Sequence, residues 1–140
     1  MTSSNLDRLV AIGKLKEEPF DQAEFVGLVK SGRVRLSDAQ IDGLALESRF
    51  DLAYNASHAL ALAGLRRLGY RSDNRYLVFQ CLEITLGIEP AHWRVLALGH
   101  ERRNVAEYEG HLDAEEQLVA GIIAVAEVVY KRLTNCWKGS

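Results

Sequence analysis

The sequence predicts an all-α protein, folded as an up-and-down bundle of four to five main helices with one long central helix. Two observations lead to this fold class. Apolar residues recur at helical spacing, as at Leu6, Leu9 and Val10 near the start of the chain. Prolines occur only at Pro19 and Pro90, and beyond one short fragment no alternating apolar run indicates a strand. Helices are therefore the elements that the pattern supports.

Turn and cap residues divide the chain into the expected helices. Pro19 stops the first helix, because the residue before a proline disfavours the helical conformation, and Ser31-Gly32 ends the second in the manner of a C-terminal glycine. Ser37 resembles an N-cap. No proline occurs from 38 to 68, which predicts one continuous helix of roughly 30 residues, or about 45 Å. The expected helices cover about 5–17, 22–31, 38–68, 76–86, 90–110 and 113–133.

The later helix boundaries rest on the same kinds of signal. The segment 69–74 is rich in turn residues and separates the long helix from the fourth, which ends at Gly87. Pro90 opens the fifth helix, since a proline at the first helical position loses no hydrogen bond. Gly110 is expected to end that helix, and Asp113–Glu116 resembles a capping box that starts the last one.

Composition and charge indicate one globular domain. A chain of 140 residues, 48% of them hydrophobic, is long enough for a single core. The 17 basic and 19 acidic residues give a net charge of −2, so any contact with nucleic acid requires a local basic patch. Cys81 and Cys136 lie far apart, which favours reduced thiols over a disulfide or a zinc site. We expect a single domain over 1–140, with a tail that is frayed from about 135 to 140.

No targeting or membrane segment is evident. The N-terminus lacks the basic region followed by an apolar run that is typical of a signal peptide. The longest apolar run, 119–129, is well below the roughly 20 residues that a membrane span needs. No two histidines are spaced as a helical zinc pair. The expectation is a cytoplasmic protein without membrane association, metal or cofactor.

The most informative stretch is 100–111, where an apolar helix becomes densely polar without changing its helical phase. Burying Arg, Asn, Glu and His side chains together costs several kcal/mol unless each finds a partner. A sequence shaped by stability alone would rarely place them there, so we expect function on this side of the helix. At about 100° per residue, one arc of the helix carries Trp93, Leu96, Ala97, His100, Arg103, Asn104, Glu107 and His111.

The long helix is the expected partner of this polar arc, because bundles build their sites from side chains on facing helices. It offers Tyr54, and its spacing places Asp51, Asn55 and His58 on one face. A basic patch follows at its C-terminal end, where cations would either complement the helix dipole or meet phosphate with support from aromatic rings. The patch consists of Arg66, Arg67, Arg71 and Arg75, beside Tyr70 and Tyr76.

Two segments of the chain resemble the HEPN superfamily (higher eukaryotes and prokaryotes nucleotide-binding). They are 50–70 and 102–110, and the resemblance extends roughly over 38–133. Its most specific part is the Arg103-Asn104 pair followed by the aromatic Tyr108. The resemblance implies a helical bundle, commonly dimeric, with the arginine motif near the dimer interface. It also implies a role in a prokaryotic defence or toxin–antitoxin system, with a nucleotidyltransferase-type protein as a partner.

Active members of the family are metal-independent ribonucleases whose motif is an Arg, a polar residue, and a His after about four to six intervening residues. Here Tyr108 follows Arg103 after four residues and His111 after seven. Cleavage needs a general base and a cation that stabilises the developing charge, roles that suit His and Arg. Tyrosine, with a reference pKa near 10, is a poor base at neutral pH.

Three functions therefore remain open. The first is a dimeric HEPN-like interaction module that contacts RNA. The second is a metal-independent ribonuclease toxin that uses Arg103 with His111 or Tyr108 as catalytic residues. The third is a purely structural dimerisation bundle, in which the polar groups fix the register of the dimer. The remaining candidate motif or binding residues are Arg102, Asn104, Glu107, Tyr108 and His100.

Overall fold

The protein is an all-α helical bundle with one very small sheet, in a computed structural model that describes residues 2–110 and 115–138. Its elements are α1 (Thr2–Ala11), β1 (Lys16–Glu17), α2 (Gln22–Asp38), α3 (Leu46–Arg67), β2 (Tyr70–Arg71), α4 (Arg75–Gln80), α5 (Leu82–Thr85), α6 (Pro90–Glu109) and α7 (Glu116–Lys138). Within those ranges no helix combines the length and the apolar character needed to cross a membrane.

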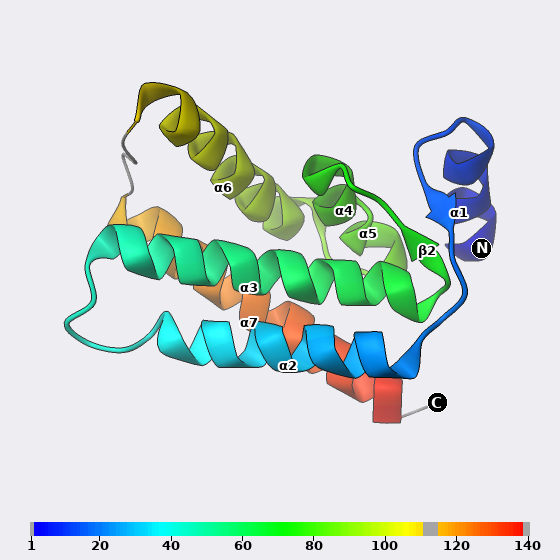
Figure 1. The fold of residues 1–140 in the computed structure, drawn as a ribbon, viewed down its shortest axis with the longest axis horizontal. Coiled ribbons are helices and arrows are strands. Elements are labelled where there is room, and N and C mark those ends of the chain that lie inside the picture. Colours follow the sequence, from blue (N-terminus) through cyan, green and yellow to red (C-terminus); the bar gives the residue numbers. More distant parts are fainter. Residues whose placement is uncertain (1, 111–114, 139–140) are drawn as a thin grey trace.

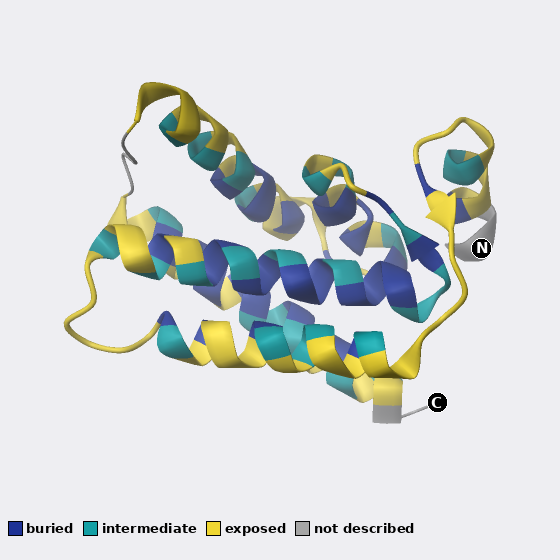
Figure 2. Ribbon diagram, in the orientation of Figure 1, coloured by how far each residue is buried: buried dark blue, intermediate teal, exposed yellow. Residues whose placement is uncertain are grey.

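Helix α3 lies at the centre of the molecule (Figure 1). Helix α2 runs beside it in the opposite direction and α7 packs behind it, whereas α6 crosses obliquely and leads away from the bundle toward its C-terminal end. The short helices α4 and α5 fill the space between α6 and the end of α3, and α1 stands at the edge of the molecule. The side of α3 that faces its neighbours is almost continuously buried (Figure 2).

The long helix expected over 38–68 begins later and is shorter in the structure. Helix α2 continues to Asp38, and α3 begins only at Leu46, after a loop in which Gly43 has a φ of +92°. Ser37 therefore lies inside a helix and does not cap one. The central helix α3 has 22 residues, about 33 Å in length, and is slightly shorter than α7 with 23.

Gly32 does not end a helix but permits two helices to meet. It is buried within α2, and a Cβ at this position would lie 2.6 Å from the side chain of Leu60 on α3. The side chain that caps α2 belongs to Asp21, which accepts a hydrogen bond of 3.1 Å from the backbone N–H of Glu24. The helix end expected at Ser31-Gly32 is therefore wrong. Gly32 lies inside α2, where the lack of a side chain allows α2 and α3 to pack closely.

The N-terminal helix is shorter than expected and is followed by a strand. Helix α1 ends at Ala11, and Gly13, with a φ of +78°, turns the chain. The segment 16–17 then pairs antiparallel with 70–71 in a two-stranded sheet that the sequence did not predict. Each strand has two residues, which is too short for an alternating pattern to be visible in the sequence.

Two further boundaries differ from the expectation. The single helix expected over 76–86 is divided at Cys81 into α4 and α5. Helix α7 continues to Lys138, within the tail for which fraying is expected from about residue 135. The ring of Trp137 lies 4.9 Å from that of Phe25, which ties this end of α7 to the start of α2.

Helix α6 has the boundaries that the sequence predicts. Pro90 lies in its first turn, and Gly110 follows it in the left-handed conformation with a φ of +83°. The expected capping box begins at Asp113, outside the described residues, and α7 begins at Glu116. Both confirmed boundaries depend on local backbone chemistry.

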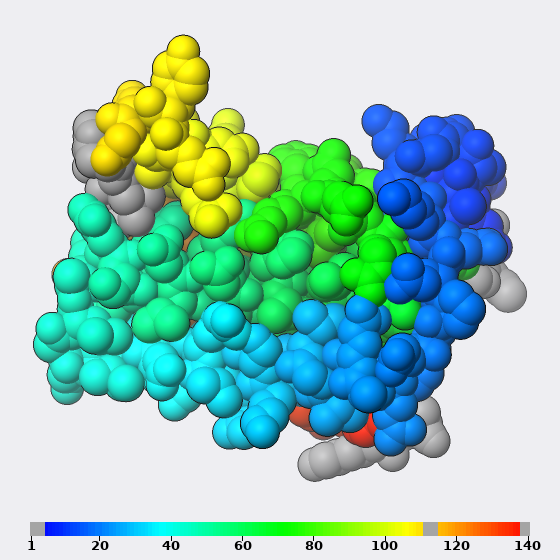
Figure 3. Space-filling model, in the orientation of Figure 1, coloured from blue at the N-terminus to red at the C-terminus, as the bar shows by residue number. Residues whose placement is uncertain are grey.

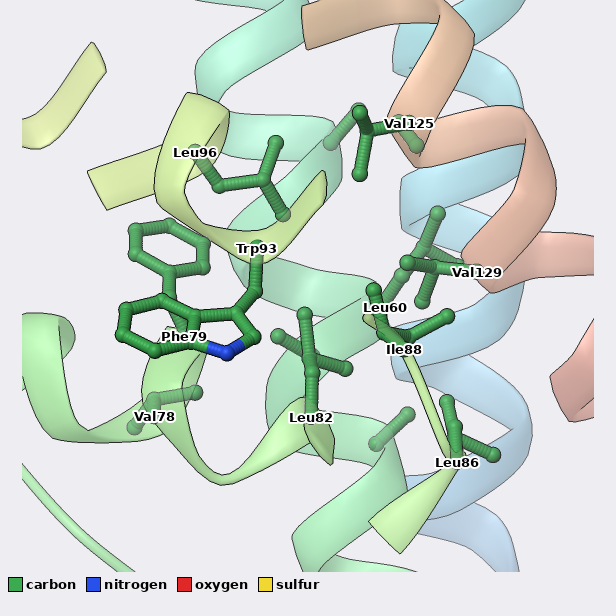
Figure 4. Close-up of a cluster of buried hydrophobic side chains, with 14 of the residues drawn as sticks. Leu60, Val78, Phe79, Leu82, Leu86, Ile88, Trp93, Leu96, Val125 and Val129 are labelled. Carbon is green, nitrogen blue, oxygen red and sulfur yellow. The ribbon is translucent and has the colours of Figure 1, made fainter. Parts of the chain in front are cut away.

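One part of the core gathers apolar side chains from α3 to α7 (Figure 4). Trp93 of α6 and Phe79 of α4 belong to this cluster, and Leu60 of α3 and Val129 of α7 meet near Ile88. The indole nitrogen of Trp93 donates a hydrogen bond of 3.0 Å to the Glu83 carboxylate, so this large side chain is buried without leaving a polar atom unsatisfied. This core anchors the first half of α6.

Candidate functional site

The polar arc of α6 begins where the helix leaves the core. Trp93 and Leu96 are buried, His100 and Arg103 are half-buried, and Asn104 is exposed. Figure 3 shows the C-terminal part of α6 (yellow) projecting beyond the surface formed by α3 and α4. The residues of α6 thus change from apolar to ionic at the point where the helix leaves the bundle.

Tyr54 of α3 is the buried residue that connects α3 to the polar arc of α6. Its side chain is completely buried, and its hydroxyl lies 3.0 Å from Nδ1 of His100. The two rings are within 13° of parallel, with centroids 6.4 Å apart. Asn104 Nδ2 lies 3.2 Å from the other ring nitrogen, Nε2. Because an amide nitrogen only donates, Nε2 accepts, and a neutral His100 carries its proton on Nδ1 and donates it to Tyr54.

Two arginines from different helices lie over the Tyr54 ring. The guanidinium carbon of Arg103, on α6, is 5.2 Å from the ring centroid, and that of Arg75, on α4, is 5.6 Å away. Each is within the distance at which a cation is attracted by an aromatic ring, an interaction worth about 0.5–2 kcal/mol. Tyr54 therefore holds two cations close to one polar ring.

His58 of α3 completes this group of side chains. It packs against Phe79, with ring centroids 6.0 Å apart and planes nearly perpendicular. Phe79 in turn lies edge-on to Tyr54 at 6.0 Å. We refer to the whole group as the Tyr54 cluster. It consists of Tyr54, His58, Arg75, His100, Arg103 and Asn104.

The Tyr54 cluster has an excess of positive charge. Among the described residues the carboxylate nearest to Arg103 is that of Glu107, at 3.6 Å on an exposed part of the same helix. Such exposed i,i+4 pairs contribute about 0.3–0.5 kcal/mol. Arg75 forms no ion pair with any described residue, and its Nη1 is buried without a hydrogen-bond partner there. A donor of this kind satisfies its hydrogen-bonding capacity when an acceptor enters the site.

Both histidines of the cluster are held in the neutral form. Burial, together with the charges of Arg75, His100 and Arg103, lowers the pKa of His58 to about 4. Burial, followed by the charges of Arg75 and Arg103, also lowers the pKa of His100, while Glu101 and Glu107 oppose the shift. Two neutral imidazoles thus stand beside two permanent cations at neutral pH.

The structure separates the residues that the sequence grouped on α6. His100, Arg103 and Asn104 come together in the Tyr54 cluster, with Glu107 beside them. Arg102 lies elsewhere, with Nη2 3.8 Å from a carboxylate oxygen of Glu115 near the start of α7. The exposed fraction of Tyr108 is 94%, and no side-chain hydrogen bond, ion pair or ring contact joins it to the cluster in the described part of the chain. His111 lies outside the described residues.

The expectation that the long helix opposes the polar arc is confirmed through Tyr54 and His58 of α3. Asp51 and Asn55 take no part in the cluster. Asp51 is exposed, and the Asn55 side chain donates a hydrogen bond of 2.9 Å to the backbone carbonyl of Asp51. Of the three residues that the sequence placed on one face of α3, only His58 belongs to the cluster.

The expected basic patch is divided between two environments. Arg66 and Arg71 are bound by Glu18 and Glu24, far from the cluster. Arg75 instead joins the Tyr54 cluster from the start of α4. Sequence reasoning missed this role, because only the packing of α3, α4 and α6 brings Arg75 and Arg103 to the same Tyr54 ring.

The described part of the chain contains no group of three or more His, Cys, Asp or Glu side chains that could hold a metal ion. The cluster instead combines guanidinium donors, a neutral imidazole and an amide. This set of groups suits an oxyanion, since arginine matches phosphate and carboxylate geometry with two parallel donors.

Comparison of the chain with family models, with curated proteins and with solved structures finds no match in any of the three. The residues of the Tyr54 cluster are therefore the basis for inferring a function.

Proposed function

We propose that this protein is a HEPN-like, dimeric interaction module of a prokaryotic defence or toxin–antitoxin type system, and that it contacts RNA at the Tyr54 cluster. The observation that carries the RNA contact is the convergence of Arg75 and Arg103 on Tyr54 with little compensating carboxylate. RNA is a polyanion bound mainly through its phosphates. A local cationic site supplies the attraction that the net charge of −2 lacks.

The dimer part of the proposal is supported by the other face of α6. Leu98, Val105 and Tyr108 are exposed and share one side of the helix, with Tyr108 almost fully in solvent. Apolar and aromatic side chains of this kind are enriched at protein interfaces. The second copy of this chain would cover them, in keeping with the dimer that the family resemblance implies. A nucleotidyltransferase-type protein remains the proposed heterologous partner.

The test of this function combines RNA binding with a mass measurement in solution. We expect the wild type to be a dimer that retains labelled RNA at low salt, and Arg103→Ala to bind at least about tenfold more weakly with its fold and dimer unchanged. Arg94→Ala is the matched control. Arg94 lies on the same helix, 5.6 Å from the ring centroid of Trp93, and outside the cluster.

Failure of the folded dimer to bind RNA at low salt would contradict the RNA contact. If Arg103→Ala mainly lowered the stability of the fold or of the dimer, the purely structural dimerisation bundle would be supported instead. A monomeric wild type at high protein concentration would contradict the proposed dimer.

A second function, that of a metal-independent ribonuclease, is favoured by one observation. His100 is neutral and lies in the same cluster as Arg103, so a base and a cation are available together. Exposed Tyr108 lies away from these groups. The candidate catalytic partners of Arg103 are therefore His100 and, outside the described residues, His111.

Incubation of purified protein with a mixed RNA pool in EDTA decides between binding and cleavage. Decay by the wild type that is absent with Arg103→Ala would establish the ribonuclease, and the same assay with His100→Ala and His111→Ala would identify the base. Intact RNA after incubation with a folded dimer that binds it would support the interaction module.

A further inference from the structure

We propose that Arg75, Arg103 and His100 form an oxyanion site for the phosphodiester groups of RNA, and that His100 takes up a proton when RNA binds. This inference rests on the proposed RNA contact and adds two features to it. One is a role for Arg75, on a different helix from the α6 motif. The other is a dependence of binding on pH.

The two arginines are available to a ligand for different reasons. Arg103 is partly exposed, and its carboxylate partner among the described residues, Glu107, is itself largely exposed and 3.6 Å away. Phosphate would replace this weak pair with charge-assisted hydrogen bonds in a fixed geometry. Arg75 holds a buried Nη1 without an acceptor among the described residues. Both guanidiniums are held in place by the same Tyr54 ring, so the site is organised before the ligand arrives.

The position of His100 links anion binding to proton uptake. The groups that face it are Tyr54 and His58 from α3, Arg75 from α4, and Glu101, Arg103, Asn104 and Glu107 from α6. The cations and partial burial disfavour the imidazolium form in the free protein. A phosphodiester between the arginines would cancel that repulsion and place a negative charge close to the ring.

The hydrogen bonds of His100 allow this change. In the neutral ring, Asn104 Nδ2 donates to Nε2, so the lone pair at Nε2 is the site where a proton would be added. After protonation Nε2 donates, and rotation of the exposed Asn104 amide presents its oxygen as the acceptor. The bond between Nδ1 and the Tyr54 hydroxyl is retained, because the hydroxyl accepts in both states. The proton comes from solvent, and up to one proton is taken up for each anion bound.

The probe for the test is a short oligouridylate without terminal phosphate, because none of its groups titrates between pH 6 and pH 8. Its affinity for the wild type is measured at both pH values at low salt. Calorimetry at pH 6 in two buffers of different ionisation enthalpy counts the protons taken up. We expect binding several-fold tighter at pH 6 than at pH 8, since a rise of one pKa unit on binding increases the affinity by at most about tenfold.

Two variants assign the effect to the proposed residues. In His100→Gln the ratio of affinities at the two pH values falls to about one, and proton uptake is lost. His92 is exposed on the same helix, and His92→Gln retains both the pH dependence and the proton uptake. Arg75→Gln weakens binding at least about tenfold at pH 6, and Arg94→Gln does not. Arg94 is the matched control, with the same 5.6 Å distance between guanidinium and aromatic ring. Circular dichroism and a thermal melt establish that each variant is folded.

The inference and the proposed function fail in different ways. Binding of the oligouridylate that is equal at pH 6 and pH 8, without proton uptake, would overturn the inference and leave the RNA contact standing. Undiminished binding by folded Arg75→Gln would also overturn the inference alone. Absence of binding at both pH values would overturn the RNA contact, and the inference with it.

Discussion

Arg66 belongs to the last turn of α3 and Arg75 lies over the Tyr54 ring of the same helix, but their surroundings differ in kind. Arg66 is 1% exposed, and each of its nitrogens has a fixed partner. Its Nε donates to the Glu24 carboxylate at 2.5 Å, Nη1 donates to the carbonyl of Glu18 at 2.8 Å, and Nη2 donates to the carbonyl of Pro19 at 2.7 Å. This arginine binds the segment before α2 to the end of α3.

Arg75 has no such set of acceptors. Its guanidinium lies over Tyr54, close to Arg103 and to two neutral histidines, with Nη1 buried and unpaired among the described residues. The contrast shows how one residue type serves two purposes. Where the fold supplies the acceptors, arginine stabilises structure, and where the fold leaves donors unused, arginine is available for a ligand.

The largest effect on stability is expected for Arg66→Ala. The substitution leaves three backbone carbonyls and the Glu24 carboxylate without their donor, at a cost of about 3–5 kcal/mol in the free energy of unfolding. Urea unfolding monitored by circular dichroism measures it. The half-buried Arg71, which shares Glu18 and Glu24, serves as the comparison, and Arg71→Ala should cost clearly less. If the two variants lost equal amounts of unfolding free energy, Arg66 would not stabilise the fold more than Arg71 does.

The second effect is a dependence of stability on pH through His58. Its pKa is near 6.5 in the unfolded chain and about 4 in the folded protein, so the unfolded state binds more protons between these values. The contribution of His58 is therefore complete above about pH 6.5 and is lost as the pH falls toward 4. The loss amounts to about 2 kcal/mol at pH 4.5.

Urea unfolding at pH 7 and pH 4.5 tests this contribution. In His58→Gln the difference between the two pH values should shrink by about 2 kcal/mol relative to the wild type, while His92→Gln behaves as the wild type does. An unchanged difference in His58→Gln would show that burial and the neighbouring positive charges do not lower the pKa of this histidine as described.

A smaller effect is expected for Tyr54→Phe. The change removes the hydroxyl that is hydrogen-bonded to His100 but keeps the ring below the two arginines, so the loss of stability is about 1 kcal/mol. The pKa of His100, followed by NMR of the imidazole resonances, reports on the same contact. A loss of several kcal/mol would mean that the cluster stabilises the fold in the way that Arg66 does.

The smallest effect on stability is expected for Arg103→Ala. Its ion pair with Glu107 is exposed, and its contact with Tyr54 is a single cation–π interaction, so the free energy of unfolding should fall by less than about 1 kcal/mol. Chemical unfolding of Arg103→Ala beside Arg66→Ala measures the contrast directly. If Arg103→Ala proved the more destabilising of the two, the distinction between structural and ligand-binding arginines would fail.

Features that depend on neighbouring residues follow from the amino-acid sequence alone. The all-α class follows from helical periodicity, and the limits of α6 follow from Pro90 and Gly110, whose backbone preferences act locally. The change along α6 from buried Trp93 to the half-buried His100 and Arg103 also follows from helical spacing. The half of the Tyr54 cluster that lies on α6 is therefore evident from residue spacing.

The other features arise only in the folded chain, because the decisive contacts join residues far apart in the sequence. The glycine at Gly32 is typical of a helix end, but packing against Leu60 keeps it inside α2. The pairing of 16–17 with 70–71 has no local signal. Arg75 and Arg103 reach the same Tyr54 ring only because α3, α4 and α6 pack together. Helical periodicity and caps reflect interactions within one element. The Tyr54 cluster, in contrast, depends on how α3, α4 and α6 pack together.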